Sequence, residues 1–174
     1  LAVGHLAELI MAFCGDGSRF GVRIRYSRED EPLGTAGPLT LIPDLRETFL
    51  VLNGDLLTDL DFATFLSEHR RRGAVATIAM SRRIVPIPLG VLETDGDGLI
   101  RDYIEKPTHE YLASMGLYLF EPEVLSHISR NARFDLPDLV KRLIAANRPV
   151  SGYLHPGLWL DIGTPADYEQ ALAE

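Results

Sequence analysis

The stretch Glu47-Thr48-Phe49-Leu50-Val51-Leu52-Asn53-Gly54-Asp55 decides the fold class of this chain. Its four consecutive apolar residues, Phe49 to Leu52, predict a strand that is buried on both faces. The strand runs directly into Asn-Gly-Asp, and helical spacing follows from Phe62 to Arg72. Asp55 is therefore expected where a buried strand passes to a helix, which is the edge of an open α/β sheet where ligands bind.

The carboxylate of Asp55 has two interpretations at that edge. It is suited to a hard divalent cation, since Mg²⁺ is bound by one or two carboxylates together with substrate phosphates. Alternatively, Asp55 caps the next helix or stabilises a turn. From the residues alone, both interpretations stay open.

The segments around this stretch predict an α/β fold. Apolar runs over residues 74–80 and 113–120 predict further strands, and helical spacing between strands indicates strand–helix–strand crossovers. Alternating residues 22–26 predict another strand, and residues 89–104 predict a β-hairpin around an Asp-Gly-Asp-Gly turn.

Composition narrows the class of protein. The 174 residues are enough for one domain with a proper core, and 46% hydrophobic with 24% charged residues is ordinary globular composition. The net charge of −8 argues against a nucleic-acid or anionic-membrane partner. The single cysteine, Cys14, excludes an internal disulfide and suits a cytoplasmic location. No apolar run approaches the length of a membrane span, and no signal peptide is visible. Because the chain begins with Leu1, we expect that the start of the gene product is absent.

Two further charged residues stand out by their neighbours. Asp161 is flanked by apolar residues on both sides and, like Asp55, ends an apolar strand next to a glycine, so we expect both acids to be buried. A buried Asp161 carboxylate should pair, accept hydrogen bonds or bind a metal. Lys106 lies in Glu105-Lys106-Pro107, where proline keeps the backbone extended. Its ammonium group could meet a phosphate as a point charge, and a surface lysine is the alternative.

A second acidic pair, Asp59 and Asp61, resembles the metal-binding triplet of many glycosyltransferases. Asp61 also directly precedes the helix predicted from Phe62, where an aspartate is a favoured N-cap. We favour the cap.

Five short motifs occur in an order that is typical of one family. They are Glu31-Pro32-Leu33-Gly34-Thr35-Ala36-Gly37, Asn53-Gly54-Asp55, Glu105-Lys106-Pro107, Gly116-Leu117-Tyr118 and Trp159-Leu160-Asp161-Ile162-Gly163-Thr164. With them, essentially the whole chain resembles the sugar-1-phosphate nucleotidyltransferases, and most closely the mannose-1-phosphate guanylyltransferase branch. The resemblance implies a three-layer α/β/α Rossmann-like nucleotide-diphospho-sugar transferase fold, formed by a single domain over residues 1–174. Its mixed, mainly parallel sheet would lack the first strand.

The resemblance also implies a reaction and its ligands. A cytoplasmic enzyme of this family joins an NTP to a sugar 1-phosphate and releases pyrophosphate. Here the pair would be GTP with mannose 1-phosphate or a related hexose or heptose phosphate. Asp55 and Asp161 match the two metal carboxylates that would hold Mg²⁺, and Lys106 matches the lysine that grips the sugar phosphate. A homo-oligomer is compatible with the sequence.

The remaining candidate residues divide between sugar and nucleotide. Glu105 and Gly90 match positions that touch the sugar, and Ser114 stands near a position where many relatives have a sugar-binding asparagine. The candidate nucleotide contacts are Gly34 and Thr35 in the turn against the base, Gly54, and Glu29 or Glu31 as acceptors for the N–H groups of guanine.

Nothing in the chain matches the glycine-rich loop that cradles the triphosphate in this family. We therefore expect the 174 residues alone to be inactive or nearly so. Two alternative functions remain: a glycosyltransferase of related fold that uses Asp59 and Asp61, and a non-catalytic module that binds nucleotide sugars.

Overall fold

A computed structural model of the protein describes residues 1–130 and 132–172. The chain divides into two compact units, each built from three segments. The first unit comprises Leu1–Val51, His69–Thr77 and Leu119–Ser151, and the second comprises Leu52–Glu68, Ile78–Tyr118 and Gly152–Glu174. A single domain over residues 1–174 stays a prediction.

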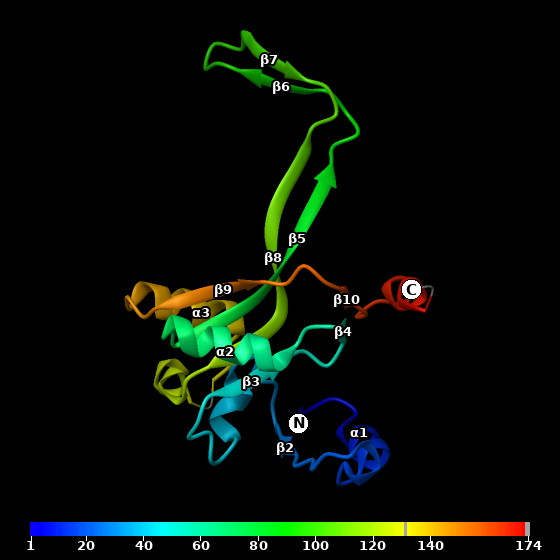
Figure 1. Ribbon diagram of the computed structural model, residues 1–174, viewed down its shortest axis with the longest axis vertical. Helices are drawn as coiled ribbons and strands as arrows, with labels where there is room; N and C mark the ends of the chain where they lie inside the picture. The colour runs from blue at the N-terminus through cyan, green and yellow to red at the C-terminus, as the bar shows by residue number, and fades with distance from the viewer. Residues whose placement is uncertain (131, 173–174) are drawn as a thin grey trace. The chain divides into compact units, whose positions relative to one another are not determined.

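The largest sheet has four strands, in the order β3 (Phe49–Leu52), β8 (Thr108–Phe120), β5 (Ala76–Pro86) and β9 (Val150–Leu154) (Figure 1). The predicted strand Phe49–Leu52 is confirmed, but its burial on both faces is wrong. Because β3 is an edge strand of this sheet, its side chains are only half-buried, and Leu52 is 50% exposed. Strands β5 and β8 are longer than the predicted ranges 74–80 and 113–120. Strand β5 ends at Pro86, which has no N–H to donate to a neighbouring strand.

The first unit contains a short parallel pair, β1 (Ala2–Val3) with β2 (Ser27–Arg28). Its helical elements are α1 (Ala7–Cys14), η1 (Ser18–Phe20), η2 (Gly37–Leu41), η3 (Pro122–His127) and α3 (Leu136–Ala145). The buried apolar side chains of this unit come chiefly from the segments around residues 74–76, 119–128 and 136–143. They include Val75, Phe120, Val124, Leu139 and Leu143.

The prediction of a strand over residues 22–26 is wrong. The backbone N–H groups of Val22 and Ile24 donate to Gly17 and Asp16 within a turn, so they do not enter a strand ladder. Gly17 and Gly21 adopt left-handed conformations that favour this turn. The strand in this region is confined to Ser27–Arg28.

The second unit contains two antiparallel ribbons. Strand β4 (Leu56–Thr58) pairs with β10 (Trp159–Asp161), and β6 (Val91–Thr94) pairs with β7 (Ile100–Ile104) in the predicted hairpin. Helix α4 (Pro165–Ala171) follows, and Thr164 caps its N-terminus: Thr164 Oγ1 accepts the N–H of Asp167 at 3.3 Å and donates to Asp167 Oδ2 at 2.6 Å.

Helix α2 (Phe62–Arg72) begins and ends where the sequence predicts. Phe65 of this helix is fully buried, and its ring lies 5.2 Å from that of Tyr153 in the second unit. With 11 residues, α2 falls well short of a bilayer, and among the described residues no helix is both long and apolar enough to cross one.

Candidate functional site

Asp55 and Asp161 come together at one end of the β4–β10 ribbon. Leu56 pairs with Asp161 in the strand register, and the N–H of Ile162 donates to the carbonyl oxygen of Asp55 at 2.8 Å. A Cβ added at Gly163 would lie 3.1 Å from one carboxylate oxygen of Asp55 and 3.1 Å from one of Asp161. The two oxygens are therefore no further apart than twice that distance, although 106 positions separate the residues in the chain.

Both carboxylates are exposed, so the expectation that these acids are buried is wrong. The ribbon has only two strands, and its end leaves the side chains open to solvent. Asp161 Oδ1 accepts the N–H of Gly163 at 3.1 Å, while within the described part of the chain no hydrogen bond or ion pair reaches the Asp55 carboxylate. Two like charges at this separation disfavour each other unless a cation lies between them.

The donor set of this pair fits Mg²⁺. The ion takes one or two carboxylates and completes an octahedron with water and substrate phosphates, which requires an open site. Over residues 1–130 and 132–172, no group of three or more His, Cys, Asp or Glu residues could hold a metal. The chain therefore offers an open two-carboxylate site and not a closed protein cage.

The candidate sugar-binding residues Gly90, Glu105 and Lys106 lie next to the β6–β7 hairpin. Lys106 is exposed and places Nζ 3.9 Å from Glu105 Oε1. Its φ of 47° is left-handed, so the expectation that Pro107 keeps this backbone extended is wrong. The hydroxyl of Tyr103 donates to Glu105 Oε2 at 3.2 Å, and a Cβ at Gly90 would overlap this hydroxyl. Sequence reasoning missed Tyr103, which connects Gly90 to Glu105 across the hairpin.

Near Ser114 and Gly116, the backbone of strand β8 closely approaches the segment that contains Asn53. Gly116 has a φ of +73°, and a Cβ there would lie 2.8 Å from Asn53 Nδ2. The N–H of Asn53 donates to the Gly116 carbonyl at 3.1 Å, while Ser114 Oγ lies 3.2 Å from the Tyr118 hydroxyl. Gly116 is thus needed for the approach of Asn53, as expected of a glycine inside a strand. Gly54 has open space where a Cβ would be.

The turn at Gly34 and Thr35 lies in the first unit and is held by the start of α3. Gly34 has a φ of +78°, a conformation that glycine adopts readily. The N–H of Thr35 donates to Asp135 Oδ1 at 2.9 Å, and Thr35 Oγ1 accepts the N–H of Leu136 at 2.8 Å. The turn is therefore fixed before any ligand binds.

Of the two candidate base-binding acids, one already has an intramolecular partner. Glu29 Oε2 accepts the N–H of Leu33 at 2.8 Å, which closes the loop ahead of the turn. Glu31 is exposed. Glu31 is accordingly the acid with its whole carboxylate available to a ligand.

The carboxylates of Asp59 and Asp61 form hydrogen bonds with different groups. Asp61 Oδ1 accepts the N–H of Ala63 at 3.0 Å, and its other oxygen accepts the Thr64 hydroxyl, so the predicted N-cap is confirmed. The Thr64 hydroxyl, together with the Ala63 N–H, lowers the pKa of Asp61. Asp59 Oδ1 instead lies 2.7 Å from Nε2 of His155.

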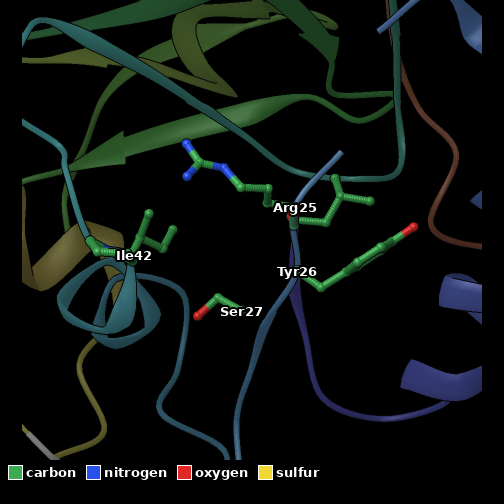
Figure 2. A pocket seen from close by; sticks show the side chains of 6 residues that line it. Arg25, Tyr26, Ser27 and Ile42 are labelled. Carbon is green, nitrogen blue, oxygen red and sulfur yellow. The ribbon is translucent and has the colours of Figure 1, made fainter. Parts of the chain in front are cut away.

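A pocket of about 150 Å³ lies in the first unit (Figure 2). Figure 2 shows Arg25, Tyr26, Ser27 and Ile42 around it, and its full lining is Leu1, Arg25, Tyr26, Ser27, Ile42 and Pro43. None of the candidate site residues is among them.

Comparison with protein families matches residues 4–174 to a model described as nucleotidyl transferase. A UTP–glucose-1-phosphate uridylyltransferase from Synechocystis is 40% identical over 98% of the chain, and a probable mannose-1-phosphate guanylyltransferase 3 from rice is 33% identical over 97%. The chain covers 49% of each of these two proteins, so it spans about half the length of the curated relatives it matches.

Solved structures support the fold. HddC from Yersinia pseudotuberculosis has a TM-score of 0.73 at 21% identity, with 99% of this chain and 76% of that chain covered. A putative glucose-1-phosphate thymidylyltransferase from Bacillus anthracis has a TM-score of 0.74 at 24% identity, with 99% and 73% covered. These likenesses confirm the predicted α/β fold, whose strand pairs are parallel in one ribbon and antiparallel in two others.

Proposed function

The chain belongs to the nucleotidyl transferase family, and we propose that the protein transfers a nucleotidyl group from an NTP to a sugar 1-phosphate. An oxygen of the sugar phosphate attacks the α-phosphorus of the NTP, a new P–O bond forms, and the bond to the leaving pyrophosphate breaks. The products are an NDP-sugar and pyrophosphate.

The observation that carries this proposal is the convergence of Asp55 and Asp161 on one open site. Their carboxylates would hold Mg²⁺ together with water and substrate phosphates. When bound, the ion offsets the negative charge that develops on the phosphate oxygens.

The other candidate residues bind and orient the substrates. Lys106 is exposed and carries a mobile positive charge suited to the phosphate of the sugar 1-phosphate. Glu105, held by Tyr103, would accept hydrogen bonds from sugar hydroxyls next to Gly90, and Ser114 is a further sugar contact. In the first unit, Gly34 and Thr35 would present backbone to the nucleobase, and in the second, Gly54 leaves room beside Asp55.

We propose GTP and mannose 1-phosphate as the substrates. Guanine offers two adjacent donors, N1–H and the exocyclic amino group, and the exposed carboxylate of Glu31 can accept from both. UTP and glucose 1-phosphate are the second candidate pair, because the uridylyltransferase relative is 40% identical whereas the rice guanylyltransferase relative is 33% identical. Uracil offers only one such donor, N3–H. A cytoplasmic location is part of the proposal.

A pyrophosphate-release assay tests the function. GTP and UTP are each combined with mannose 1-phosphate and with glucose 1-phosphate, with and without Mg²⁺, using the protein encoded by the complete gene and the 174-residue chain. We expect Mg²⁺-dependent release with GTP and mannose 1-phosphate from the encoded protein, and little from the 174 residues alone, because triphosphate positioning dominates this chemistry.

Two other results would overturn the proposal. Binding of a nucleotide sugar without any pyrophosphate release would favour the non-catalytic module. Transfer of sugar from a nucleotide sugar to an acceptor would favour the glycosyltransferase, for which the separate engagement of Asp59 and Asp61 gives no support.

A further inference from the structure

His155 and Asp59 form a hydrogen-bonded pair in the second unit that the proposed chemistry does not use. His155 Nε2 lies 2.7 Å from Asp59 Oδ1, and the His155 residue is only 8% exposed. The backbone N–H of His155 donates to the carbonyl oxygen of Met80 at 2.8 Å, which ties this histidine to strand β5. A buried imidazole fixed at both its backbone and its ring is a rigid anchor for the more exposed carboxylate.

The pair lies at the opposite end of the β4–β10 ribbon from the two candidate metal carboxylates. Thr58 pairs with Trp159 at this end, and the N–H of Asp59 donates to the Leu158 carbonyl at 3.3 Å. Strand β4 is thus bounded by Asp55 on one side and Asp59 on the other.

Each of these aspartates meets a glycine that flanks β10. A Cβ at Gly157 would lie 2.5 Å from Asp59 Oδ1, and a Cβ at Gly163 would lie 3.1 Å from Asp55 Oδ2. The Asp59 carboxylate can therefore reach His155 only because position 157 has no side chain. The Asp59–His155 hydrogen bond lies at one end of the ribbon. At the other end lie two carboxylates that have no ion-pair partner among the described residues.

The β4–β10 ribbon needs an interaction outside its own ladder to fix its strand register. Its ladder is only three residue pairs long, and a two-stranded ribbon of this size is not stable on its own. A slip of one residue would turn every side chain of β10 to the opposite face, and Asp161 would leave Asp55. Repulsion between these two carboxylates favours such a slip whenever no cation is bound.

We propose that Asp59 and His155 are a positioning pair, which fixes the register of the β4–β10 ribbon and so keeps Asp55 and Asp161 at one cation site. The claim rests on the proposed function for the identity of that site. The pair itself touches neither the cation nor a substrate. It acts like the outer hydrogen-bond partners that orient the ligands of metal sites.

The test measures cation affinity and the opening of the β4–β10 ribbon, both in the protein encoded by the complete gene. Mn²⁺ alone is titrated by calorimetry, and hydrogen exchange is followed at the Ile162 N–H, which donates to the Asp55 carbonyl. We expect His155→Ala to raise the Kd for Mn²⁺ about tenfold, as loss of an outer partner does in other metal sites. Exchange at Ile162 should become faster in the absence of metal. His155→Gln, whose amide can still donate to Asp59, should restore most of both properties.

Asp161→Asn is the matched control, because it removes a ligand and leaves the positioning pair in place. It should abolish Mn²⁺ binding without accelerating exchange at the Asp59 N–H. Equal Mn²⁺ affinity and equal Ile162 exchange in the wild type and His155→Ala would overturn the positioning role. If the wild type binds no Mn²⁺, the metal site of the proposed function fails. The exchange data alone then decide whether His155 fixes the register: unchanged exchange in His155→Ala refutes it, and faster exchange supports it. Should His155→Ala fail to fold, Asp59→Ala gives the same comparison from the exposed side of the pair.

Discussion

Two polar clusters of this protein, one in each unit, differ in whether their hydrogen-bonding and charged groups find partners within the chain. In the first unit, His69 is 1% exposed and lies 2.6 Å from Thr77 Oγ1 through Nδ1 and 3.0 Å from Glu121 Oε1 through Nε2. The chain of contacts continues to Thr48, which donates to Glu121 at 2.8 Å, and to Ser151, 2.8 Å from Thr77. In the second unit, Asp55 and Asp161 share an open site, where the Gly163 N–H donates to Asp161.

The difference separates structural from ligand-binding polar groups. Burying a polar side chain costs free energy unless every group has a partner, and the His69 cluster meets that condition within the chain. Two exposed carboxylates held close together without a cation lower stability, and their arrangement is understandable only if something outside the chain completes it. The first cluster should therefore govern folding, and the second should govern activity.

Asp55→Asn tests the second half of this comparison and has the largest expected effect. Turnover in the pyrophosphate-release assay should fall about a hundredfold or more, because the carboxylate acts through charge that develops in the transition state. Nucleotide affinity should change little, and stability without metal should stay equal or rise, since one of two like charges is removed. Steady-state kinetics and thermal unfolding measure these quantities.

Asp97→Asn, in the exposed turn of the β6–β7 hairpin, is the control for removing a surface charge. Turnover should be unchanged in this variant. A large loss of stability in Asp55→Asn, with turnover preserved in the folded fraction, would show that Asp55 is structural and would break the comparison.

His69→Ala tests the first half. The substitution leaves Thr77 and Glu121 without their shared partner, so the free energy of unfolding should fall by about 1–3 kcal/mol. Urea titration measures the loss. The KM values and turnover of the folded enzyme should be unchanged.

Thr48→Val removes only the end of the same chain of contacts and should cost less than His69→Ala. If the two variants are equally stable, His69 is not the centre of the cluster. If His69→Ala instead lowers turnover at full stability, the division between the clusters fails.

Lys106→Ala asks whether the open site extends to the sugar phosphate. Lys106 Nζ makes a weak, exposed contact with Glu105 at 3.9 Å, so the loss of this side chain should leave stability unchanged. The KM for the sugar 1-phosphate should rise about tenfold, as expected for one charged contact, while the KM for the NTP changes little. Varying each substrate in turn separates the two, and an equal rise for both would assign Lys106 a different role.

The sequence predicted individual strands and helices better than the exposure of the side chains in these clusters. Apolar runs, helical spacing and the Asp61 cap predicted β3 and α2, because local spacing governs those elements. Exposure of Asp55 and Asp161 was missed, since whether an edge strand or a ribbon end is covered depends on neighbours that no local pattern encodes.

Pairings between distant side chains were missed for a related reason. His69 with Glu121 and His155 with Asp59 join residues 52 and 96 positions apart, and a single histidine in a helix or a loop gives no signal of its partner. The left-handed turns at Gly17 and Gly21 likewise overrode the alternation of residues 22–26.

Asp61 shows that an exposed carboxylate can still have hydrogen-bond partners within the chain. It is exposed like Asp55 but, like Glu121, it accepts hydrogen bonds from other residues of the chain. The hydrogen bonds from Thr64 and from the Ala63 N–H lower the pKa of Asp61 below its ordinary value of 3.8. The ionised carboxylate therefore stabilises helix α2 fully above the ordinary pKa, and this contribution is lost as the pH falls through the lowered pKa of the folded state.

Asp61→Ala should accordingly lower the urea midpoint at pH 7, and the difference from wild type should shrink at pH 3. Asp61→Asn keeps an acceptor for the Ala63 N–H but cannot ionise, so its difference from wild type should be smaller and should also depend on pH. Activity should be unchanged in both variants, with the smallest effects of the four residues. A pH-independent difference would show that the cap acts by geometry alone. A loss of activity at full stability would show that Asp61, like Asp55, binds a ligand. Hydrogen-bond partners within the chain would then no longer distinguish a structural carboxylate from one that binds a ligand.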